Sequence, residues 1–211
     1  RSLRDQGLVV HDGMREPTLA LVLSWAGFFM ANRAGLLVWG FERGGLRWSW
    51  TQTVIQGLFV GVFIALADAL VFSRFMPDPH RPPGTPSVLA RLGALVYGAV
   101  NEEVMLRLFA ATAVLFLLGM LNTVSSPPRS HLIAAVVVSS FLFALLHLPA
   151  AASVWPLTTT VMVRTIVLNV AAGLVLGFLY VIRGLEYSMM AHLGLGFGLV
   201  LVERTMSVLG D

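Results

Sequence analysis

The 211-residue chain has no cysteine, no lysine and few charged residues of either sign. The absence of cysteine excludes disulfides, thiolate metal sites and a cysteine nucleophile. Charged residues make up 12% of the chain, about half of the roughly 25% typical of soluble domains. In contrast, 57% of the residues are hydrophobic and the mean hydropathy is +0.82. Most of the surface must therefore face something other than water, which predicts an integral membrane protein.

All 14 basic residues are arginines, and the formal net charge is +3. They are scattered singly along the chain instead of clustering on one face, so the sequence has no nucleic-acid footprint and predicts no nucleic-acid partner. Successive loops carry similar numbers of arginines, so the positive-inside rule does not fix an orientation. The lipid bilayer is the partner that the composition predicts.

Long apolar runs dominate the chain. A membrane-spanning helix needs about 20 mostly apolar residues. Runs of this kind lie at 18–40, 51–73, 87–121, 132–148, 157–182 and 187–208. The third is too long for one span and is expected to bend or divide near Asn101, giving about six to eight transmembrane helices. Because alternating strand patterns are absent, we predict an all-α, polytopic membrane helix bundle and not a closed barrel.

Short segments rich in proline and glycine separate the runs, for example "MPDPHRPPGTP" at 76–86 and "SSPPRS" at 125–130. None is long enough to form a second domain. The predicted organisation is a polar N-terminal segment at 1–17 followed by a single membrane-embedded domain at 18–211.

Some charged residues lie inside the apolar runs, where ionisable groups are costly and often functional. Arg164 and Arg204 lie near the ends of their runs and are expected to snorkel to the membrane surface. Asp68 and Arg33 lie deeper. We expect each to belong to a buried structural pair, or to pair with the polar cluster that follows.

That cluster is "EEVMLR" at 102–107. On a helix, Glu103 and Arg107 are four residues apart and can pair on one face, whereas Glu102 is rotated by about 100° from Glu103. Glu102 is then free to point elsewhere, and burial among apolar groups would raise the pKa of its carboxyl toward the range of a general base. The alternative is a charge cluster at a water-exposed helix start, where acids favour the helix dipole.

Two of the five histidines also lie inside apolar runs, His147 in "SSFLFALLHLP" and His192 in "SMMAHLGLGF". Phe143 is four residues before His147, so its ring can pack against the imidazole. A lone intramembrane histidine is more often a packing residue than a catalyst. Two histidines together with a free glutamate indicate a functional site.

These motifs resemble the type II CAAX prenyl endopeptidases and their bacterial relatives, the bacteriocin-processing and abortive-infection-like intramembrane proteases. The resemblance rests on EExxxR at 102–107, FxxxH at 143–147 and a later helix carrying His192, and it covers about residues 90–200. It implies a multi-pass intramembrane endopeptidase of a bacterial or archaeal cell membrane. The implied substrate is a peptide or membrane protein, with or without a prenyl group.

The resemblance also assigns roles to the residues that match. Glu102 is the base that activates water, Glu103 and Arg107 support the site, and His147 and His192 complete it. Peptide hydrolysis needs such an activated water, a donor for the developing oxyanion and a proton for the leaving amine.

One position departs from the family pattern. The last motif usually continues as HxxxN or HxxxD, and its final polar residue is thought to help hold the oxyanion, but here that position is Gly196. Asn169 and Asn101 are candidates for a replacement donor, since a buried amide needs partners in any case.

A metal-dependent version of the site stays open. Two histidines and one carboxylate form a recognised catalytic zinc set, so Glu102, His147 and His192 could bind zinc, with Glu103 as the base. No HExxH sequence is present and no motif specifies a metal. The metal-independent glutamate mechanism is therefore preferred, and a divalent metal such as zinc is the alternative cofactor.

Two other functions compete with the protease. A catalytically silent relative could act as a membrane scaffold or regulatory binding protein, and Gly196 is the residue that favours this. A transporter with a proton relay would also use buried glutamates and histidines, but the two halves of matching hydropathy typical of such folds are not seen. Retention of every candidate acid, base and arginine favours the enzyme.

Glycines recur at helical spacing. Gly173 and Gly177 form a small-xxx-small step that lets two helices approach closely. Gly194, Gly196 and Gly198 alternate and do not form a nucleotide-binding fingerprint, so close helix packing is again expected, ahead of room for a substrate backbone.

Overall fold

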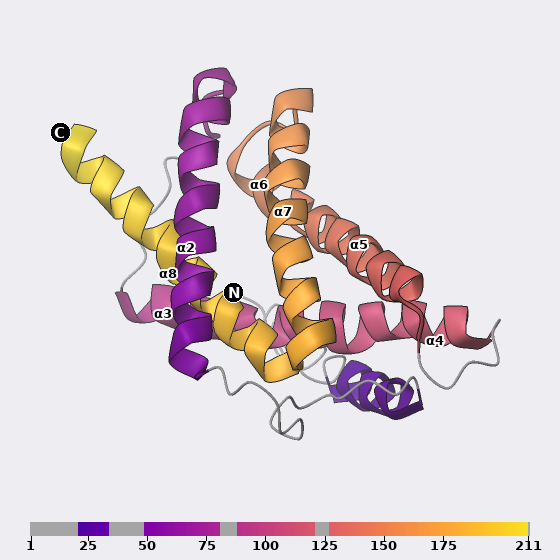
Figure 1. Ribbon diagram of the computed structural model, residues 1–211. Coiled ribbons are helices and arrows are strands. Elements are labelled where there is room, and N and C mark those ends of the chain that lie inside the picture. Colours follow the sequence, from indigo (N-terminus) through magenta and orange to yellow (C-terminus); the bar gives the residue numbers. More distant parts are fainter. Residues whose placement is uncertain (1–20, 34–48, 81–87, 121–126, 211) are drawn as a thin grey trace, which may run out of the picture.

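The computed structural model describes residues 21–33, 49–80, 88–120 and 127–210. These residues form helices joined by short connections, and no strand occurs among them (Figure 1). The predicted polar segment 1–17 lies outside the described residues. Four helices are long and apolar enough to cross a membrane, which confirms the all-α membrane bundle: Trp50–Phe75, Arg129–Val154, Thr159–Arg183 and Leu185–Met206. The expected count of six to eight is approximate, because the run at 18–40 is only partly described.

Helix α2 (Trp50–Ala67) begins at a capping box. The Ser49 hydroxyl accepts from the Gln52 amide at 3.2 Å, and the Gln52 side chain accepts from the Ser49 amide at 3.0 Å. These bonds satisfy amides that the first helical turn would otherwise leave unpaired. The helix continues as a π-helical segment, η2 (Asp68–Phe72), and a 3₁₀ turn, η3 (Ser73–Phe75).

Asp68, at the start of η2, forms an ion pair with Arg164 of α7 (Thr159–Arg183). The Arg164 Nε atom donates to Asp68 Oδ1 at 2.6 Å, and the guanidinium carbon lies 5.1 Å from the centre of the Trp155 ring. The prediction of a structural pair for Asp68 is confirmed. Arg164, for which the sequence predicted snorkelling, therefore has a carboxylate of another segment as its partner. Arg33 instead lies 5.0 Å from the Phe29 ring centre.

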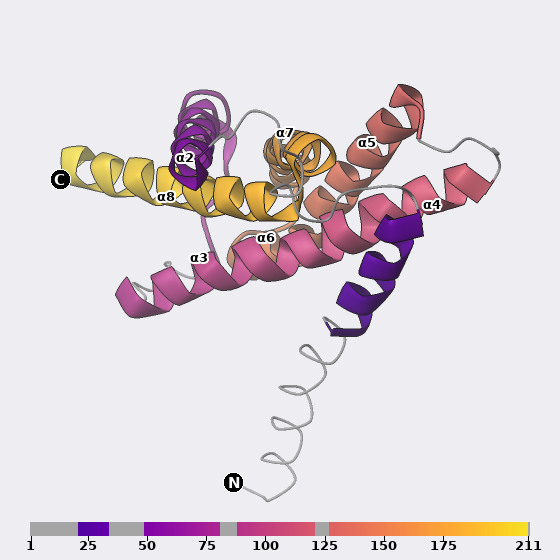
Figure 2. The same ribbon diagram turned by 60° about the horizontal axis from the view of Figure 1, so that its bottom comes forward.

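The run at 87–121 was expected to bend or divide near Asn101, but it does not divide there, and only its winding changes. The chain stays helical through α3 (Val88–Glu103), the π-helical segment η4 (Val104–Ala111) and α4 (Thr112–Met120), and Figure 2 shows these three as one long helix. The winding changes directly after Glu103. The "EEVMLR" motif therefore spans the junction between an α-helical and a π-helical turn, a feature often found at functional sites.

Helices α5 (Arg129–Leu146) and α7 form an antiparallel pair, joined through the short α6 (Leu148–Val154). The pair packs through small residues, since a Cβ at Gly173 would lie 2.9 Å from the Ser140 backbone and one at Gly177 would lie 3.0 Å from Val136. This confirms the predicted small-xxx-small contact.

Helix α8 (Leu185–Gly210) follows α7 after a single residue, Gly184, whose φ of 110° lies in the region that glycine adopts easily. It packs closely on α2. A Cβ at Gly57 would lie 2.0 Å from the Ala191 carbonyl oxygen, and one at Gly194 would lie 2.0 Å from the Val54 oxygen. Glycine on both helices lets the two backbones touch, which fixes the position of His192 beside Ala191.

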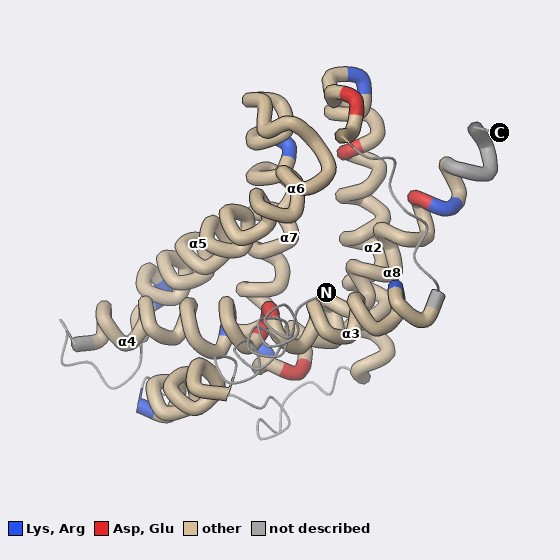
Figure 3. Tube along the Cα trace, turned by 180° about the vertical axis from the view of Figure 1, so that it is seen from behind, with Lys and Arg blue, Asp and Glu red and all other residues tan. Residues whose placement is uncertain are grey.

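Charged residues are sparse along the helices, as Figure 3 shows for the described chain. Many large apolar side chains are exposed instead, including Trp25 at 74%, Phe63 at 72% and Leu70 at 71%. Such surfaces suit lipid, not water, and support an integral membrane protein.

Candidate active site

The ion pair predicted within the EExxxR motif is present and fully buried. Arg107 Nε lies 3.4 Å from Glu103 Oε2, and neither side chain is exposed. The guanidinium also donates from an Nη atom to the Gly173 carbonyl at 3.4 Å, and its carbon lies 5.1 Å from the Phe143 ring centre. Arg107 thus joins η4 to both α5 and α7.

The π-helical turn is held by two hydroxyl groups. Thr112 donates to the Arg107 carbonyl at 3.2 Å and lies 2.8 Å from the Tyr180 hydroxyl of α7. A π-helical turn interrupts the regular ladder of backbone hydrogen bonds in an α-helix. A side chain that bonds a carbonyl displaced from this ladder stabilises the turn. These bonds fix the backbone that carries Arg107.

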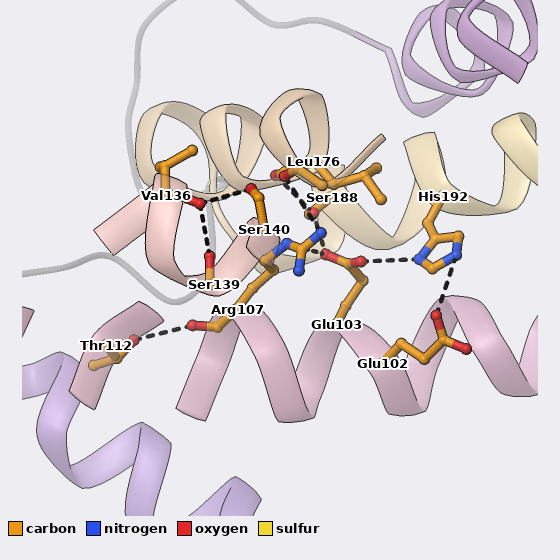
Figure 4. Close-up of polar contacts among 11 residues, drawn as sticks. Glu102, Glu103, Arg107, Thr112, Val136, Ser139, Ser140, Leu176, Ser188 and His192 are labelled. Atoms are coloured by element: carbon orange, nitrogen blue, oxygen red, sulfur yellow. Dashed lines mark hydrogen bonds and ion pairs between the residues drawn. The ribbon is translucent and has the colours of Figure 1, made fainter. Parts of the chain in front are cut away.

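Glu103 is the centre of a polar network, which Figure 4 shows in close-up. Its Oε1 atom lies 2.9 Å from Nδ1 of His192, and its Oε2 atom accepts from the hydroxyl of Ser188. Ser188 also lies 2.9 Å from the Leu176 carbonyl. Because an ionised carboxylate only accepts, Nδ1 of His192 carries a proton, and Nε2 of the neutral ring is left as an acceptor.

His147 lies where α5 gives way to α6. Pro149 follows within two residues, and the His147 amide bonds the Ala144 carbonyl at 3.2 Å. The Phe143 carbonyl is thereby available to the imidazole, whose Nδ1 atom lies 2.8 Å away. A carbonyl only accepts, so Nδ1 carries a proton here too and Nε2 of the neutral ring is an acceptor. The Phe143 ring packs 4.5 Å from that of His147, as the sequence predicted.

Glu102 points away from Arg107 and toward both histidines. Its Oε2 atom lies 3.8 Å from Nε2 of His192 and 3.9 Å from Nε2 of His147. This oxygen is inaccessible and has no hydrogen-bond partner, although the side chain as a whole is 35% exposed. Three acceptor atoms from three helices therefore face one another. Glu102 is thus only partly buried, because its carboxyl lies at the edge of a cavity with otherwise largely apolar walls.

That cavity has a volume of about 250 Å³ and is lined by Glu102 and His147. Its other walls are apolar and come from Met105, Leu106, Leu146 and Ala150. The carboxylate and one imidazole thus lie in a space that an apolar side chain could enter.

Asn169 and Asn101, the candidates for a replacement oxyanion donor, have different surroundings. The Asn169 amide donates to the Thr165 carbonyl at 2.8 Å, one turn earlier on the same helix. Asn101 is half-buried on α3, next to Glu102. A Cβ at Gly196 would lie 2.5 Å from Cδ2 of Leu95, so the Leu95 side chain occupies the place of the usual polar residue.

The donor set of Glu102, His147 and His192 has the chemistry of a zinc site, but its spacing does not fit. Ligands of one tetrahedral zinc ion at bond lengths of 2.0–2.1 Å lie roughly 3.4 Å apart, and the contacts here are 3.8 and 3.9 Å. Nowhere in the described part of the chain are three such side chains placed to hold one metal ion. Glu103, proposed as the base of the metal version, is already bonded to His192 and Ser188.

Sequence reasoning missed three residues of the network, namely Ser188, Thr112 and Tyr180. Ser188 had a usable signal, because it is four residues before His192 and so lies on the same helix face. The positions of Thr112 and Tyr180 in the network depend on the π-helical winding, which no local sequence pattern predicted.

One of three comparisons with known proteins finds a match. No curated protein and no solved structure matches the chain. A family described as type II CAAX prenyl endopeptidase Rce1-like matches residues 84–197, more than half of the chain. The matched region contains both glutamates, Arg107 and both histidines of the network. The chain therefore belongs to the Rce1-like family of type II CAAX prenyl endopeptidases.

Proposed function

We propose that the protein is an intramembrane endopeptidase that hydrolyses a peptide bond with a water molecule activated by Glu102. Family membership supports a CAAX-type protease function and a peptide substrate in the membrane. The observation that carries the mechanism is the meeting of Glu102 Oε2 with two imidazole Nε2 atoms at 3.8 and 3.9 Å. These three atoms are all hydrogen-bond acceptors, so a molecule bound between them must donate hydrogen bonds. Water donates two.

Glu102 is the general base of the proposed reaction. It takes a proton from the water as the water oxygen forms a bond to the peptide carbonyl carbon. The C–N bond of the resulting tetrahedral intermediate then breaks, and the proton is delivered to the leaving amine. The products are a carboxyl group and an amine, so one water molecule is consumed.

The two histidines have different roles because different groups contact their Nδ1 atoms. Nδ1 of His192 contacts the carboxylate of Glu103, which stabilises a positive ring, whereas Nδ1 of His147 contacts the neutral Phe143 carbonyl. We assign proton transfer to His192 and orientation of the water to His147. Ser188 and Arg107 are positioning residues, since both act through Glu103.

A protonated His192 also supplies a donor. Its Nε2–H could bond the oxyanion or the leaving amine, which would offset the absent side chain at Gly196. Neither Asn169 nor Asn101 is needed in this scheme. The proposed substrate is a peptide, prenylated or not, with an apolar side chain in the cavity beside Glu102.

The test is cleavage of membrane-embedded peptide reporters by wild type and by Glu102→Gln. The amide keeps the size of the side chain but cannot accept the proton, so the rate should fall by the ~10²–10⁴-fold typical of general-base loss. Glu203→Gln is the matched control, because Glu203 is an exposed carboxylate paired with Arg91 on the surface. Unchanged cleavage by Glu102→Gln would reject Glu102 as the base.

The second candidate function is a catalytically silent membrane scaffold. The argument for it is Gly196, where Leu95 fills the place of the usual polar residue. If wild type cleaves nothing in a panel of prenylated and unprenylated peptides, the scaffold becomes the better proposal.

A further inference from the structure

The ion pair between Asp68 and Arg164 lies outside the polar network of the two glutamates. Nε of Arg164 donates to Oδ1 of Asp68 at 2.6 Å and an Nη atom donates to Oδ2, so the guanidinium is held at two points. Asp68 is 26% exposed and Arg164 is 20% exposed. A pair as buried as this gains little net stability, because desolvation offsets the attraction of the charges. What the pair does provide is a fixed orientation for the guanidinium.

The oriented guanidinium also contacts Trp155. Its carbon lies 5.1 Å from the centre of the Trp155 ring, within the range of a cation–π contact. Trp155 directly follows α6 and is its C-cap residue. The two hydrogen bonds to Asp68 fix the plane of the guanidinium, and this plane fixes where the indole ring packs. The ion pair thus holds the C-terminal end of α6.

A backbone hydrogen bond holds the same end of α6. The amide of His80 donates to the carbonyl of Val154 at 2.8 Å, one residue before Trp155. His80 lies in the connection that follows η3, and Asp68 begins the π-helical segment before it. The stretch 68–80 therefore reaches α6 twice, directly through His80 and indirectly through Arg164 of α7.

Helix α6 connects this anchored end to His147. It has only seven residues, and His147 directly precedes it. Two successive hydrogen bonds run along it, from the Trp155 amide to the Ala151 carbonyl at 2.9 Å and from the Ala151 amide to the His147 carbonyl at 3.0 Å. A helix this short moves as a unit, because each of these bonds ties one turn to the next. A shift of Trp155 would therefore displace His147, and also Ala150 in the wall of the cavity.

The contact that aims the imidazole of His147 is local. Its Nδ1 atom lies 2.8 Å from the Phe143 carbonyl, four residues earlier in the chain. This contact sets the rotation of the ring but not its distance from Glu102, which belongs to a different helix. The 3.9 Å between Nε2 of His147 and Oε2 of Glu102 depends on where the end of α5 lies, and α6 continues that end.

We propose that Asp68 and Arg164 are positioning residues for His147: their ion pair, acting through Trp155 and α6, holds the imidazole at its distance from Glu102. The inference rests on the proposed function, in which His147 orients the water. A misplacement of about 1 Å at a reacting centre can cost about 100-fold in rate, so a contact outside the cavity is sufficient to affect the reaction. The alternative is a purely structural clamp, whose loss loosens the whole bundle without a selective effect on His147.

Asp68→Asn in the full chain tests the proposal. The amide keeps the size of the side chain but removes the charge that orients Arg164. NMR of ¹⁵N-labelled imidazoles should show a shift of the His147 resonances, assigned with His147→Gln, while those of His192 stay near wild type. With a cleaved reporter, kcat should fall by about 10- to 100-fold and KM should change less, because a misplaced water affects the reaction step more than peptide binding.

Trp155→Ala is the second variant, and it leaves the ion pair itself intact. It should shift the His147 resonances as Asp68→Asn does. Trp155→Phe should restore much of the wild-type spectrum, because an aromatic ring is still present for the guanidinium. The double variant Asp68→Asn with Trp155→Ala should shift His147 no further than the larger single effect, since both changes break the same chain of contacts.

Glu203→Gln is the matched control. It removes the carboxylate of another ion pair between two helices, because Glu203 is paired with Arg91, but this pair joins α8 to α3 and not η2 to α7. The His147 resonances of this variant should match those of wild type.

Unchanged His147 resonances in both Asp68→Asn and Trp155→Ala would overturn the proposal. Equal shifts of His147 and His192 would also overturn it, in favour of the structural clamp. If wild type cleaves no peptide, the proposed function fails, but a selective shift of His147 would still support the positioning role, because the NMR measurement requires no activity.

Discussion

Nδ1 of His192 lies 2.9 Å from Oε1 of Glu103, a carboxylate that is fully buried. The same carboxylate neutralises Arg107 through its other oxygen. Glu103 therefore belongs both to the packing of the bundle and to the proposed chemistry. Glu102 is different, because its Oε2 atom has no hydrogen-bond partner and faces the two imidazoles. Stability and reactivity should consequently respond differently to changes at these neighbouring residues.

Glu103→Gln should destabilise the protein. It leaves the guanidinium of Arg107 buried without a counter-charge, and breaking a buried ion pair from one side typically costs about 3–5 kcal/mol. Thermal melting in detergent should show a clear fall in Tm, whereas Glu102→Gln should melt close to wild type.

The control removes both charges. Glu103→Met combined with Arg107→Met replaces the pair by apolar side chains of similar length, which is often neutral for stability. The double variant should recover most of the lost Tm but not the cleavage activity. A double variant as unstable as Glu103→Gln would show that the unpaired charge is not the cause.

Ser188→Ala should disturb His192 through Glu103. The Ser188 hydroxyl bonds Glu103 Oε2, and hydrogen bonds to charged groups contribute about 1.5–3 kcal/mol. Without it the carboxylate is less well fixed, so the proportion of His192 protonated at Nδ1 should fall and cleavage should slow by about ten-fold or more. ¹⁵N NMR of the imidazole nitrogens measures the tautomer without requiring activity.

Ser139→Ala is the comparison for this variant. Ser139 is equally buried, but its hydroxyl donates only to the Val136 carbonyl of its own helix. Its removal should leave the His192 resonances and the cleavage rate near wild type. If the two variants shift the His192 tautomer equally, Ser188 has no special role in positioning Glu103.

The class of fold could be predicted because composition and run length decide it. With 12% charged residues and apolar runs of about 20 residues, a membrane helix bundle is the arrangement that satisfies the backbone. The Glu103–Arg107 pair could also be predicted, since four-residue spacing on a helix brings side chains together. Both features depend on local pattern alone.

The partners across helices could not be predicted in this way. Asp68 and Arg164 are 96 positions apart, and nothing in either run indicates that the two helices meet there. The π-helical winding after Glu103 depends on Thr112 and Tyr180, one of them from α7. The close packing expected at Gly194 and Gly198 is present, but the sequence did not identify α2 as the partner, although Gly57 and Gly61 repeat the four-residue spacing recognised at Gly173.

Purified protein should not contain stoichiometric zinc. The contacts between Glu102 and the two histidines are longer than those between ligands of one tetrahedral zinc ion, and Glu103 is engaged elsewhere. Elemental analysis of protein purified without chelator measures this directly. One tightly held ion per chain, lost in His147→Ala and in His192→Ala, would instead make Glu102 a ligand.

Gly57→Ala should both destabilise the bundle and impair the site. A methyl group at this position would lie 2.0 Å from the carbonyl oxygen of Ala191 and 2.7 Å from its carbonyl carbon, and these are backbone atoms that cannot rotate away. Overpacking of this kind typically costs about 1–3 kcal/mol, occasionally more. Helix α8 would have to move, and with it His192, the residue after Ala191.

The matched control for Gly57→Ala is Gly93→Ala. Gly93 is also within a helix, but a methyl group there would meet nothing within 4 Å. Replacing an exposed helical glycine by alanine stabilises a helix by roughly 0.5–1 kcal/mol, so this variant should melt at or slightly above the wild-type Tm. Cleavage and melting should be measured for both variants beside wild type. Because α8 carries His192 and α2 fixes α8, a Gly57→Ala protein that melts like Gly93→Ala and cleaves at the wild-type rate would show that the two backbones do not touch at Gly57.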